Sequence, residues 1–151
     1  MIELALYQPD IPQNVGAAIR LCACLGTPLN IIEPCGFPWD ERKIRTSAMD
    51  YYDLLDIKRH SGWETFHQES TQRIVLLTTK TDQAYTDFTF QDGDILMLGR
   101  ESAGVPIDIH QRLQHKVTIP MHGQARSINV INAGAIVLGE ALRQNALKLE
   151  Q

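Results

Sequence analysis

The residues with the clearest chemical potential lie in a loop and at the start of the helix-length segment that follows it. The loop ends in Gln124 and Arg126, and Ser127 and Asn129 stand where we expect the helix to begin. The first N–H groups of a helix lack partners within the helix, so a polar cluster there favours a polar or anionic ligand. A capped core helix after a loop is the other interpretation, and the residues alone leave both open.

The segment that follows is predicted to be a helix with two apolar faces. Two stripes recur at spacings of three and four residues, one of mostly large and one of mostly small side chains. The first comprises Ile128, Ile131, Ala135, Leu138 and Leu142, and the second comprises Val130, Gly134, Val137 and Ala141. A helix over 127–144 with two apolar faces needs two partners, namely its own sheet and something else.

An amphipathic helix between two short apolar strands opens the chain. Strands are expected at 2–7 and 29–32, and the helix between them at 14–26, with Asn14 as its cap and Gly26 as its stop. Such a unit is typical of a parallel sheet. Further strands are predicted at 54–57, 73–79, 94–98 and 116–119, further helices at 62–68 and 107–113, and a part-helical excursion at 40–52. The predicted fold is a single α/β domain whose open, mostly parallel sheet is flanked by helices.

Three loops rich in Gly, Pro and polar residues leave strand ends in this arrangement. They follow Leu77, Leu98 and Ile119. Ligands of open parallel sheets bind beyond the carboxyl ends of the strands, so the three loops are expected to outline one pocket. The loop from Gly99 to Pro106 matches neither the phosphate-binding P-loop nor the G-x-G-x-x-G fingerprint. By itself it is equally typical of a tight strand-to-helix turn.

Several common chemistries have no support in the sequence. Cys22 and Cys24 lack the spacing of zinc ligands, and with five scattered His residues we expect no metal site. No G-x-S-x-G elbow indicates a hydrolase, and Cys35 has no evident base partner.

The composition is that of an ordinary globular protein. The 151 residues, 44% apolar and 21% charged, are most simply one domain over 1–151 without an appended RNA-binding domain. We see no signal peptide and no membrane span of ~20 apolar residues. An odd number of Cys residues fits a reduced, cytoplasmic protein. The net charge of −4 argues against broad nucleic-acid binding, whereas three basic clusters argue the other way: Arg42, Lys43 and Arg45; Lys58, Arg59 and His60; Arg112, His115 and Lys116.

Three motifs occur in order along the chain. They are NVGAAIR at 14–20, LGRESAGVP at 98–106, and IPM at 119–121 followed by RSIN at 126–129. Together they resemble the motifs of the SpoU branch of the SPOUT RNA methyltransferases. The runs LYQPDIPQN at 6–14 and IIEPCGF at 31–37 resemble the TrmL type in particular. Enzymes of that type methylate the ribose 2′-hydroxyl of the wobble nucleotide, a cytidine or modified uridine, in the anticodon of tRNA.

The resemblance implies a cofactor, a topology and an assembly. The cofactor is S-adenosylmethionine, bound bent between the three strand-end loops and released as S-adenosylhomocysteine. The topology is a C-terminal trefoil knot. The assembly is a homodimer whose interface includes helix 127–144, with the stripe of small residues as its contact face. The positions that match cofactor-binding residues are Leu77, Gly99, Ile119 and Ser127, with Glu101 and Met121 close by.

The resemblance also implies roles at the reaction centre. Arg20, Ser127 and Asn129 match the catalytic positions, and Asn14, Arg20 and Arg126 match positions that bind the RNA substrate. A guanidinium stays protonated and is therefore a poor base. We expect Arg20 to orient the nucleotide and to stabilise the alkoxide that develops on its 2′-oxygen.

Two positions depart from the resemblance, and the function keeps alternatives. Arg100 stands where many TrmL-type proteins have Pro, and Gly139 where they often have an aromatic residue. Glu101 either lies near the sulfonium of the cofactor or organises its own loop. The expected substrate is the anticodon stem-loop of tRNA, in particular that of leucine tRNA. The alternatives are 2′-O-methylation of ribosomal RNA or of another tRNA position, and a non-catalytic module that binds RNA or a nucleotide.

Overall fold

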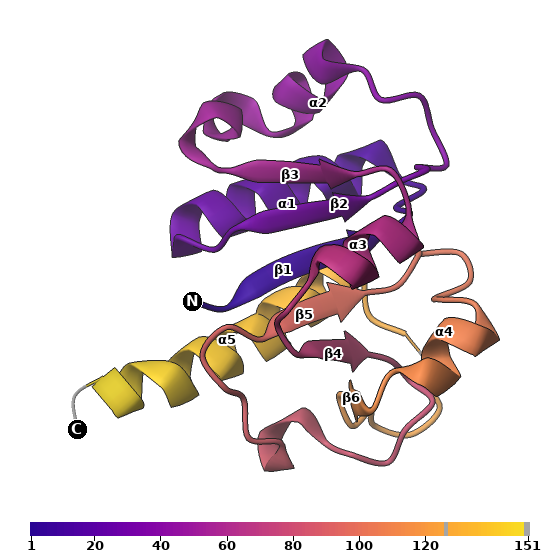
Figure 1. The fold of residues 1–151 in the computed structure, drawn as a ribbon, viewed down its shortest axis with the longest axis vertical. Coiled ribbons are helices and arrows are strands. Elements are labelled where there is room, and N and C mark those ends of the chain that lie inside the picture. Colours follow the sequence, from indigo (N-terminus) through magenta and orange to yellow (C-terminus); the bar gives the residue numbers. More distant parts are fainter. Residues whose placement is uncertain (126, 150–151) are drawn as a thin grey trace.

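The computed structural model, which describes residues 1–125 and 127–149, is built on a six-stranded sheet (Figure 1). The strands lie in the order β3-β2-β1-β5-β4-β6, and every neighbouring pair is parallel. The predicted α/β fold with a mostly parallel sheet is confirmed, and the described sheet is parallel throughout. The strands are β1 (Glu3–Tyr7), β2 (Leu29–Ile32), β3 (Ile57–His60), β4 (Ile74–Leu77), β5 (Ile95–Leu98) and β6 (His115–Val117).

Helices cover both faces of the sheet, as predicted. In Figure 1, α3 and α4 lie in front of the strands, and α1 and α5 lie behind them. The helices are α1 (Pro12–Leu25), α2 (Glu41–Ser47), α3 (Trp63–Glu69), α4 (Ile107–Arg112) and α5 (Val130–Leu149), with the 3-10 segments η1 (Met49–Leu54) and η2 (Tyr85–Asp87). Within the described residues, no helix combines the length and the apolar character that crossing a membrane requires.

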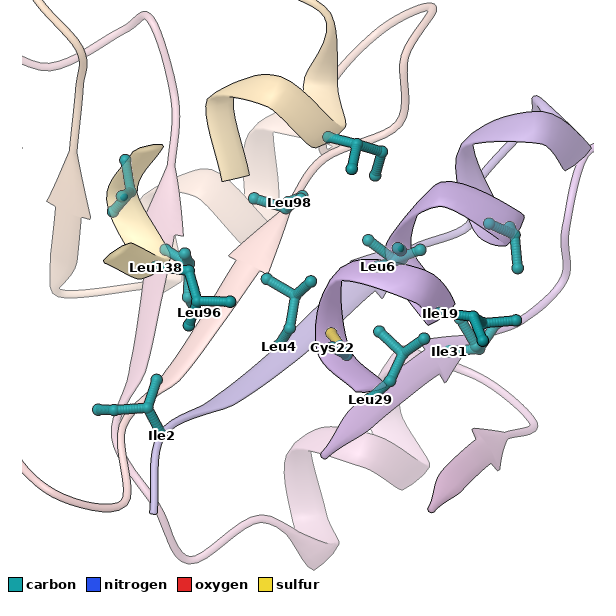
Figure 2. Packing of buried hydrophobic residues seen from close by; sticks show 14 of the residues in the cluster. Ile2, Leu4, Leu6, Ile19, Cys22, Leu29, Ile31, Leu96, Leu98 and Leu138 are labelled. Atoms are coloured by element: carbon teal, nitrogen blue, oxygen red, sulfur yellow. The ribbon is translucent and has the colours of Figure 1, made fainter. Parts of the chain in front are cut away.

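The core has two parts because successive strand residues point to opposite faces of the sheet. In β1, Leu4 and Leu6 join the cluster under α1 and α5, whereas Ala5 and Tyr7 join the cluster under α3 and α4. Both faces are buried, which explains why the central strands read as near-continuous apolar runs. Figure 2 shows the first cluster, in which residues of β1 and β5 pack against α1 and α5. The strand residues are Leu4, Leu6, Leu96 and Leu98, and the helix residues are Ile19, Cys22 and Leu138.

Several predicted boundaries are corrected by the structure. The strand predicted at 54–57 is wrong, because Met49–Leu54 forms η1 and β3 begins only at Ile57. Asn14 does not cap α1, because the helix already begins at Pro12, whose fixed φ suits a first helical position. Gly26 ends that helix in the left-handed conformation at φ 65°, as predicted.

The C-terminal helix begins later than predicted. Asn129 caps α5, because its side-chain oxygen accepts hydrogen bonds from the backbone N–H groups of Ile131 (3.0 Å) and Asn132 (3.2 Å). Ile128 therefore precedes the helix and is not part of an apolar stripe on it.

The stripe of small residues lies in the core of its own chain. Val137 and Ala141 are fully buried, and a Cβ added to Gly134 would lie 2.7 Å from the side chain of Leu98. The prediction that this stripe is the dimer face is therefore wrong. Small side chains are needed there because α5 packs closely on β5.

Candidate active site

A pocket of about 470 Å³ opens at the carboxyl ends of β1, β4, β5 and β6. The loops that follow Leu77, Leu98 and Ile119 all contribute to it, so the prediction of one pocket shared by three loops is confirmed. The loop between β1 and α1 forms a further wall. The predicted site residues that line the pocket are Asn14, Leu77, Gly99, Glu101, Ile119, Met121, Ser127 and Asn129.

The loop after β5 is closed on itself by paired backbone hydrogen bonds. Arg100 N–H donates to Gly104 O at 3.0 Å, and Gly104 N–H donates to Arg100 O at 2.8 Å. A Cβ added to Gly99 would lie 2.8 Å from Gly104 Cα, so only glycine fits where the beginning and the end of the loop meet. The loop therefore presents its backbone, rather than a side chain, to the pocket at Gly99.

Glu101 ties this loop to the loop between β1 and α1. Its Oε2 accepts a hydrogen bond of 2.9 Å from the backbone N–H of Asp10, and its Oε1 accepts one of 3.1 Å from Asn14 Nδ2. The hydroxyl of Ser102 donates to the side chain of Asp10. Both oxygens of Glu101 thus have partners within the protein, which favours the interpretation that Glu101 organises its loop.

The same network reaches the start of α5. Asn129 Nδ2 donates a hydrogen bond of 3.3 Å to Asn14 Oδ1, while Asn129 Oδ1 caps the helix. Asn14 is only 9% exposed and is engaged at both ends of its amide. Three segments that are distant in sequence are thus joined by one chain of hydrogen bonds under the pocket.

The two carboxyl groups of this network have pKa values that move in opposite directions. Burial, and then the contact with Asp10, raise the pKa of Glu101 above its ordinary value. The contacts with Glu101, and then with Ser102, lower the pKa of Asp10. Neighbouring carboxyl groups disfavour double ionisation, so such a separation is expected.

A second polar group lies where α4 meets the loop after β4. His110 Nε2 is 3.2 Å from Thr78 Oγ1, which also accepts a hydrogen bond of 3.1 Å from Lys80 N–H. Lys116 Nζ donates to His110 O at 2.8 Å. Burial, followed by the charges of Lys116 and Lys80, lowers the pKa of His110 and thereby favours the neutral form of its imidazole beside the pocket.

Arg100 is directed toward the end of β1. Its guanidinium donates a hydrogen bond to Gln8 Oε1 and lies 5.6 Å from the ring centroid of Tyr7. Arg100 thus fastens the loop after β5 to β1 through its side chain. This contact is a structural consequence of having Arg at a position where the resemblance implies Pro.

Two predicted residues are not placed in the pocket. Arg20 lies exposed on α1, where it contacts Met49 and Tyr51 of η1, and it is not among the residues that line the pocket. Arg126 lies outside the described residues. The catalytic, substrate-binding and cofactor-binding roles of the predicted residues stay predictions.

Each of the three predicted basic clusters contains an arginine that is paired with a carboxylate. Arg45 pairs with Glu41 at 2.9 Å and with Asp53 at 2.7 Å. Arg59 pairs with Glu33 at 2.6 Å, and Arg112 pairs with Glu64 at 3.0 Å. The positive charge available to RNA from these clusters is therefore smaller than the sequence indicates. Among the described residues, no group of three or more His, Cys, Asp or Glu side chains could hold a metal ion.

Two residues that line the pocket, Thr78 and His110, and one that holds Glu101 in place, Asp10, were not identified from the sequence. Thr78 directly follows Leu77 and could have been included as part of the same strand-end loop. His110 lies on α4, and only the folded chain brings it to Thr78. Asp10 lies in a Pro-marked turn, and its link to Glu101 has no local signal in the sequence.

Comparison with known proteins identifies the family. A model of the SpoU rRNA Methylase family matches residues 1–139. A relative from Beijerinckia indica, named tRNA (cytidine(34)-2′-O)-methyltransferase, is 54% identical over 144 residues and covers 93% of this chain and 90% of its own. A relative of the same name from Escherichia coli K12 is 43% identical over 147 residues and covers 95% of this chain and 94% of its own.

Solved structures agree with this assignment. A structure that gave insights into the 2-OH methylation of C/U34 on tRNA matches with a TM-score of 0.91 and 34% identity, over 97% of both chains. The SpoU methyltransferase AviRb from Streptomyces viridochromogenes, in complex with the cofactor AdoMet, matches with a TM-score of 0.74 and 28% identity, over 97% of this chain and 60% of that one. As its three ordered motifs predict, the chain belongs to the SpoU rRNA Methylase family.

Proposed function

We propose that this protein transfers a methyl group from S-adenosylmethionine to the ribose 2′-hydroxyl of the nucleotide at position 34 of tRNA. The observation that carries the proposal is a pocket at the strand ends that is lined by residues of all three family motifs. Relatives that are 43% and 54% identical over most of the chain bear the name of that activity. We expect the substrate to be the anticodon stem-loop of leucine tRNA and the reaction to take place in the cytoplasm.

The residues of the pocket fit S-adenosylmethionine. The volume of about 470 Å³ lies within the usual range for small-molecule sites. Leu77, Ile119 and Met121 offer apolar walls for a flat base, and the glycine at position 99 leaves backbone groups accessible to its edge. Bound there, the cofactor supplies a methyl group on a positively charged sulfur. Glu101 shapes this site through its hydrogen bonds to Asp10 and Asn14.

The chain's own residues must align the 2′-hydroxyl and stabilise the charge that develops as its proton leaves. We assign Arg20 to orient the nucleotide and stabilise the alkoxide, because a guanidinium donates well and is a poor base. Ser127 and Asn129 contribute polar atoms at the pocket, where Asn129 also caps α5. Asn14 holds Glu101 and Asn129 in place, so its contribution to substrate binding is indirect.

We also propose a homodimer in which each site is completed by the partner. Arg20 lies outside its own pocket, which supports delivery of this side chain to the pocket of a second subunit. The exposed face of α5 supports the same proposal, because Ile136 is 42% exposed and nothing lies within 4 Å of a Cβ added to Gly139. Arg126, between the pocket residues Met121 and Ser127, is proposed to contact the RNA.

The trefoil knot stays a prediction. Support comes from the two loops that would form it, at 99–106 and 119–129, because both line the same pocket and Glu101 and Asn129 share Asn14 as a partner. A knot would hold these loops together and preorganise the pocket before the cofactor binds.

Transfer of a labelled methyl group tests the proposal. Purified protein, labelled S-adenosylmethionine and total tRNA should give label in tRNA, and Arg20→Ala should abolish incorporation while cofactor affinity measured by calorimetry is kept. Label in ribosomal RNA but not in tRNA would select the ribosomal alternative. Binding of tRNA without incorporation would instead support the non-catalytic module.

A further inference from the structure

We propose that Tyr51 and Met49 form a holder that positions the guanidinium of Arg20 for methyl transfer. This inference rests on the proposed function, because it requires Arg20 to act at the reaction centre. Both residues belong to η1, which packs against α1, and they lie outside the set that lines the pocket. They are positioning residues, since they act on the reaction only through Arg20.

The contacts of Arg20 are made by an aromatic face and a thioether. The central carbon of its guanidinium lies 5.5 Å from the ring centroid of Tyr51, within the range of a cation–π interaction. Its Nη1–H donates to Met49 Sδ at 3.3 Å, and a thioether is a weak acceptor. These contacts restrict the side chain without adding a negative charge beside it.

Five other arginines of the described chain are paired with carboxylates, whereas Arg20 is not. No carboxylate of the described residues forms an ion pair with Arg20. The arginines that do pair with carboxylates are Arg45, Arg59, Arg73, Arg112 and Arg143. A carboxylate would compete with phosphate or alkoxide for the same N–H groups. The holder instead keeps the charge and most donors of Arg20 available to a substrate.

Backbone packing fixes the holder relative to Arg20. Gly16 lies one helical turn before Arg20, on the same face of α1. A Cβ added to Gly16 would lie 2.4 Å from Ser47 Cβ and 2.7 Å from Ser47 C, so α1 and the end of α2 are in direct backbone contact. Ala48, the next residue, is fully buried, and its carbonyl accepts a hydrogen bond of 3.2 Å from Tyr51 N–H.

The backbone of Met49 is itself unusual. Its φ of 58° lies in the left-handed region, which residues other than Gly, Asn and Asp rarely adopt. Such a conformation persists only where the surroundings fix it, and here it places the thioether of a residue that is 56% exposed against Arg20. The unfavourable backbone and the contact with Arg20 occur at the same residue, which supports a functional reason for both.

Single-turnover methyl transfer at saturating tRNA tests the holder. Tyr51→Leu removes the ring and should lower the rate about two- to thirty-fold, the range that a cation–π contact spans. Tyr51→Phe keeps the ring and should keep the rate within about two-fold of that of the native protein. Met49→Leu should lower the rate less than Tyr51→Leu does. The affinity for S-adenosylmethionine should be unchanged in all three variants.

Tyr52→Leu is the matched control. It removes the neighbouring tyrosine ring, which lies 4.2 Å from the guanidinium of Arg45, an arginine already paired with Glu41 and Asp53. The single-turnover rate should not change. A fall in this rate equal to that caused by Tyr51→Leu would show that both substitutions act by disturbing η1 as a whole, and it would overturn the proposal.

The Arg20→Ala background separates positioning from stability. Tyr51→Leu should cause no further loss there, because the group that it positions is absent. The ring-current shift of the Arg20 Nε–H proton, measured by NMR, should disappear in Tyr51→Leu and remain in Tyr51→Phe. A further loss in the Arg20→Ala background, or an unchanged rate in Tyr51→Leu, would overturn the holder. Absence of methyl transfer by the native protein would overturn the proposed function, while the ring-current shift would still report the contact.

Discussion

Asn14 Nδ2 lies 3.1 Å from Glu101 Oε1, although the two residues are 87 positions apart in the sequence. This contact joins the first family motif to the second beneath the pocket. Because Asn14 also accepts a hydrogen bond from Asn129, the third motif is fastened to the same point. The pocket walls are thus held together by polar side chains as well as by the sheet.

Replacement of Glu101 by Gln should reduce stability and cofactor affinity together. The amide has one acceptor oxygen, so either Asp10 N–H or Asn14 Nδ2 loses its partner, at a cost of about 1–3 kcal/mol. Urea unfolding and calorimetric titration with S-adenosylmethionine measure the two effects. Glu64→Gln, which affects an exposed ion pair, is the control and should cost less than about 1 kcal/mol. Loss of methyl transfer at native stability and affinity would assign Glu101 a direct role in the reaction.

Replacement of Gly16 by Ala should be destabilising, although alanine is the better helix former. The added Cβ would lie 2.4 Å from Ser47 Cβ and 2.7 Å from the backbone carbon Ser47 C. Backbone atoms cannot move aside as the end of a flexible side chain can. We expect a loss of about 1–3 kcal/mol in the free energy of unfolding, typical of overpacking. Ala17→Ser, on the exposed side of the same helix, should change stability little. Equal stability of Gly16→Ala and the native protein would contradict the close packing of α1 on α2.

His110 should make the protein less stable toward acid. Its pKa is lowered in the folded state from an ordinary value of 6.5, so its contribution is present in full above that value. The contribution is lost as the pH falls through the lower folded-state pKa, because the partly buried ring must then take up a proton. Urea midpoints at pH 8 and at pH 5 should differ less in His110→Gln than in the native protein. An identical difference in both proteins would exclude His110 as a source.

The exposed face of α5 should mediate dimerisation. Ile136→Glu places a charge on this face and should produce monomers in sedimentation experiments, with loss of methyl transfer. Ile107→Glu on α4, where the native side chain is 74% exposed, is the control and should leave the oligomeric state unchanged. A native protein that is monomeric at micromolar concentration would contradict the homodimer.

Most of the fold follows from sequence patterns, because apolar runs and turn residues report local structure. The β–α–β unit at the start and the end of β5 at Leu98 are clear for that reason, whereas the strand predicted at 73–79 already ends at Leu77. The strand predicted at 54–57 starts too early because Leu54, the last residue of the 3-10 segment η1, has the same apolar character as a strand residue, and β3 begins only at Ile57. The small-residue stripe of α5 was misassigned because periodicity identifies apolar faces but does not identify their partners.

The sequence predicted many of the residues of the site but not the contacts that join them. Motif resemblance supplied eight of the residues that line the pocket, and three strand-end loops indicated where it would lie. The link from Asp10 to Glu101 and the contact of His110 with Thr78 join residues far apart in the sequence, so no local pattern reports them. The contacts of Arg20 with Tyr51 and Met49 could not be foreseen, because a helix residue shows its partners only after the helices pack.

The position of the methyl group in the product tests methyl transfer to position 34 of tRNA most directly. Leucine tRNA is incubated with the protein and S-adenosylmethionine, digested, and mapped by mass spectrometry. We expect a 2′-O-methyl group on the nucleotide at position 34, and we expect this group to be absent when Arg20 is replaced by Ala. Methylation at any other position, or none at all, would contradict this expectation.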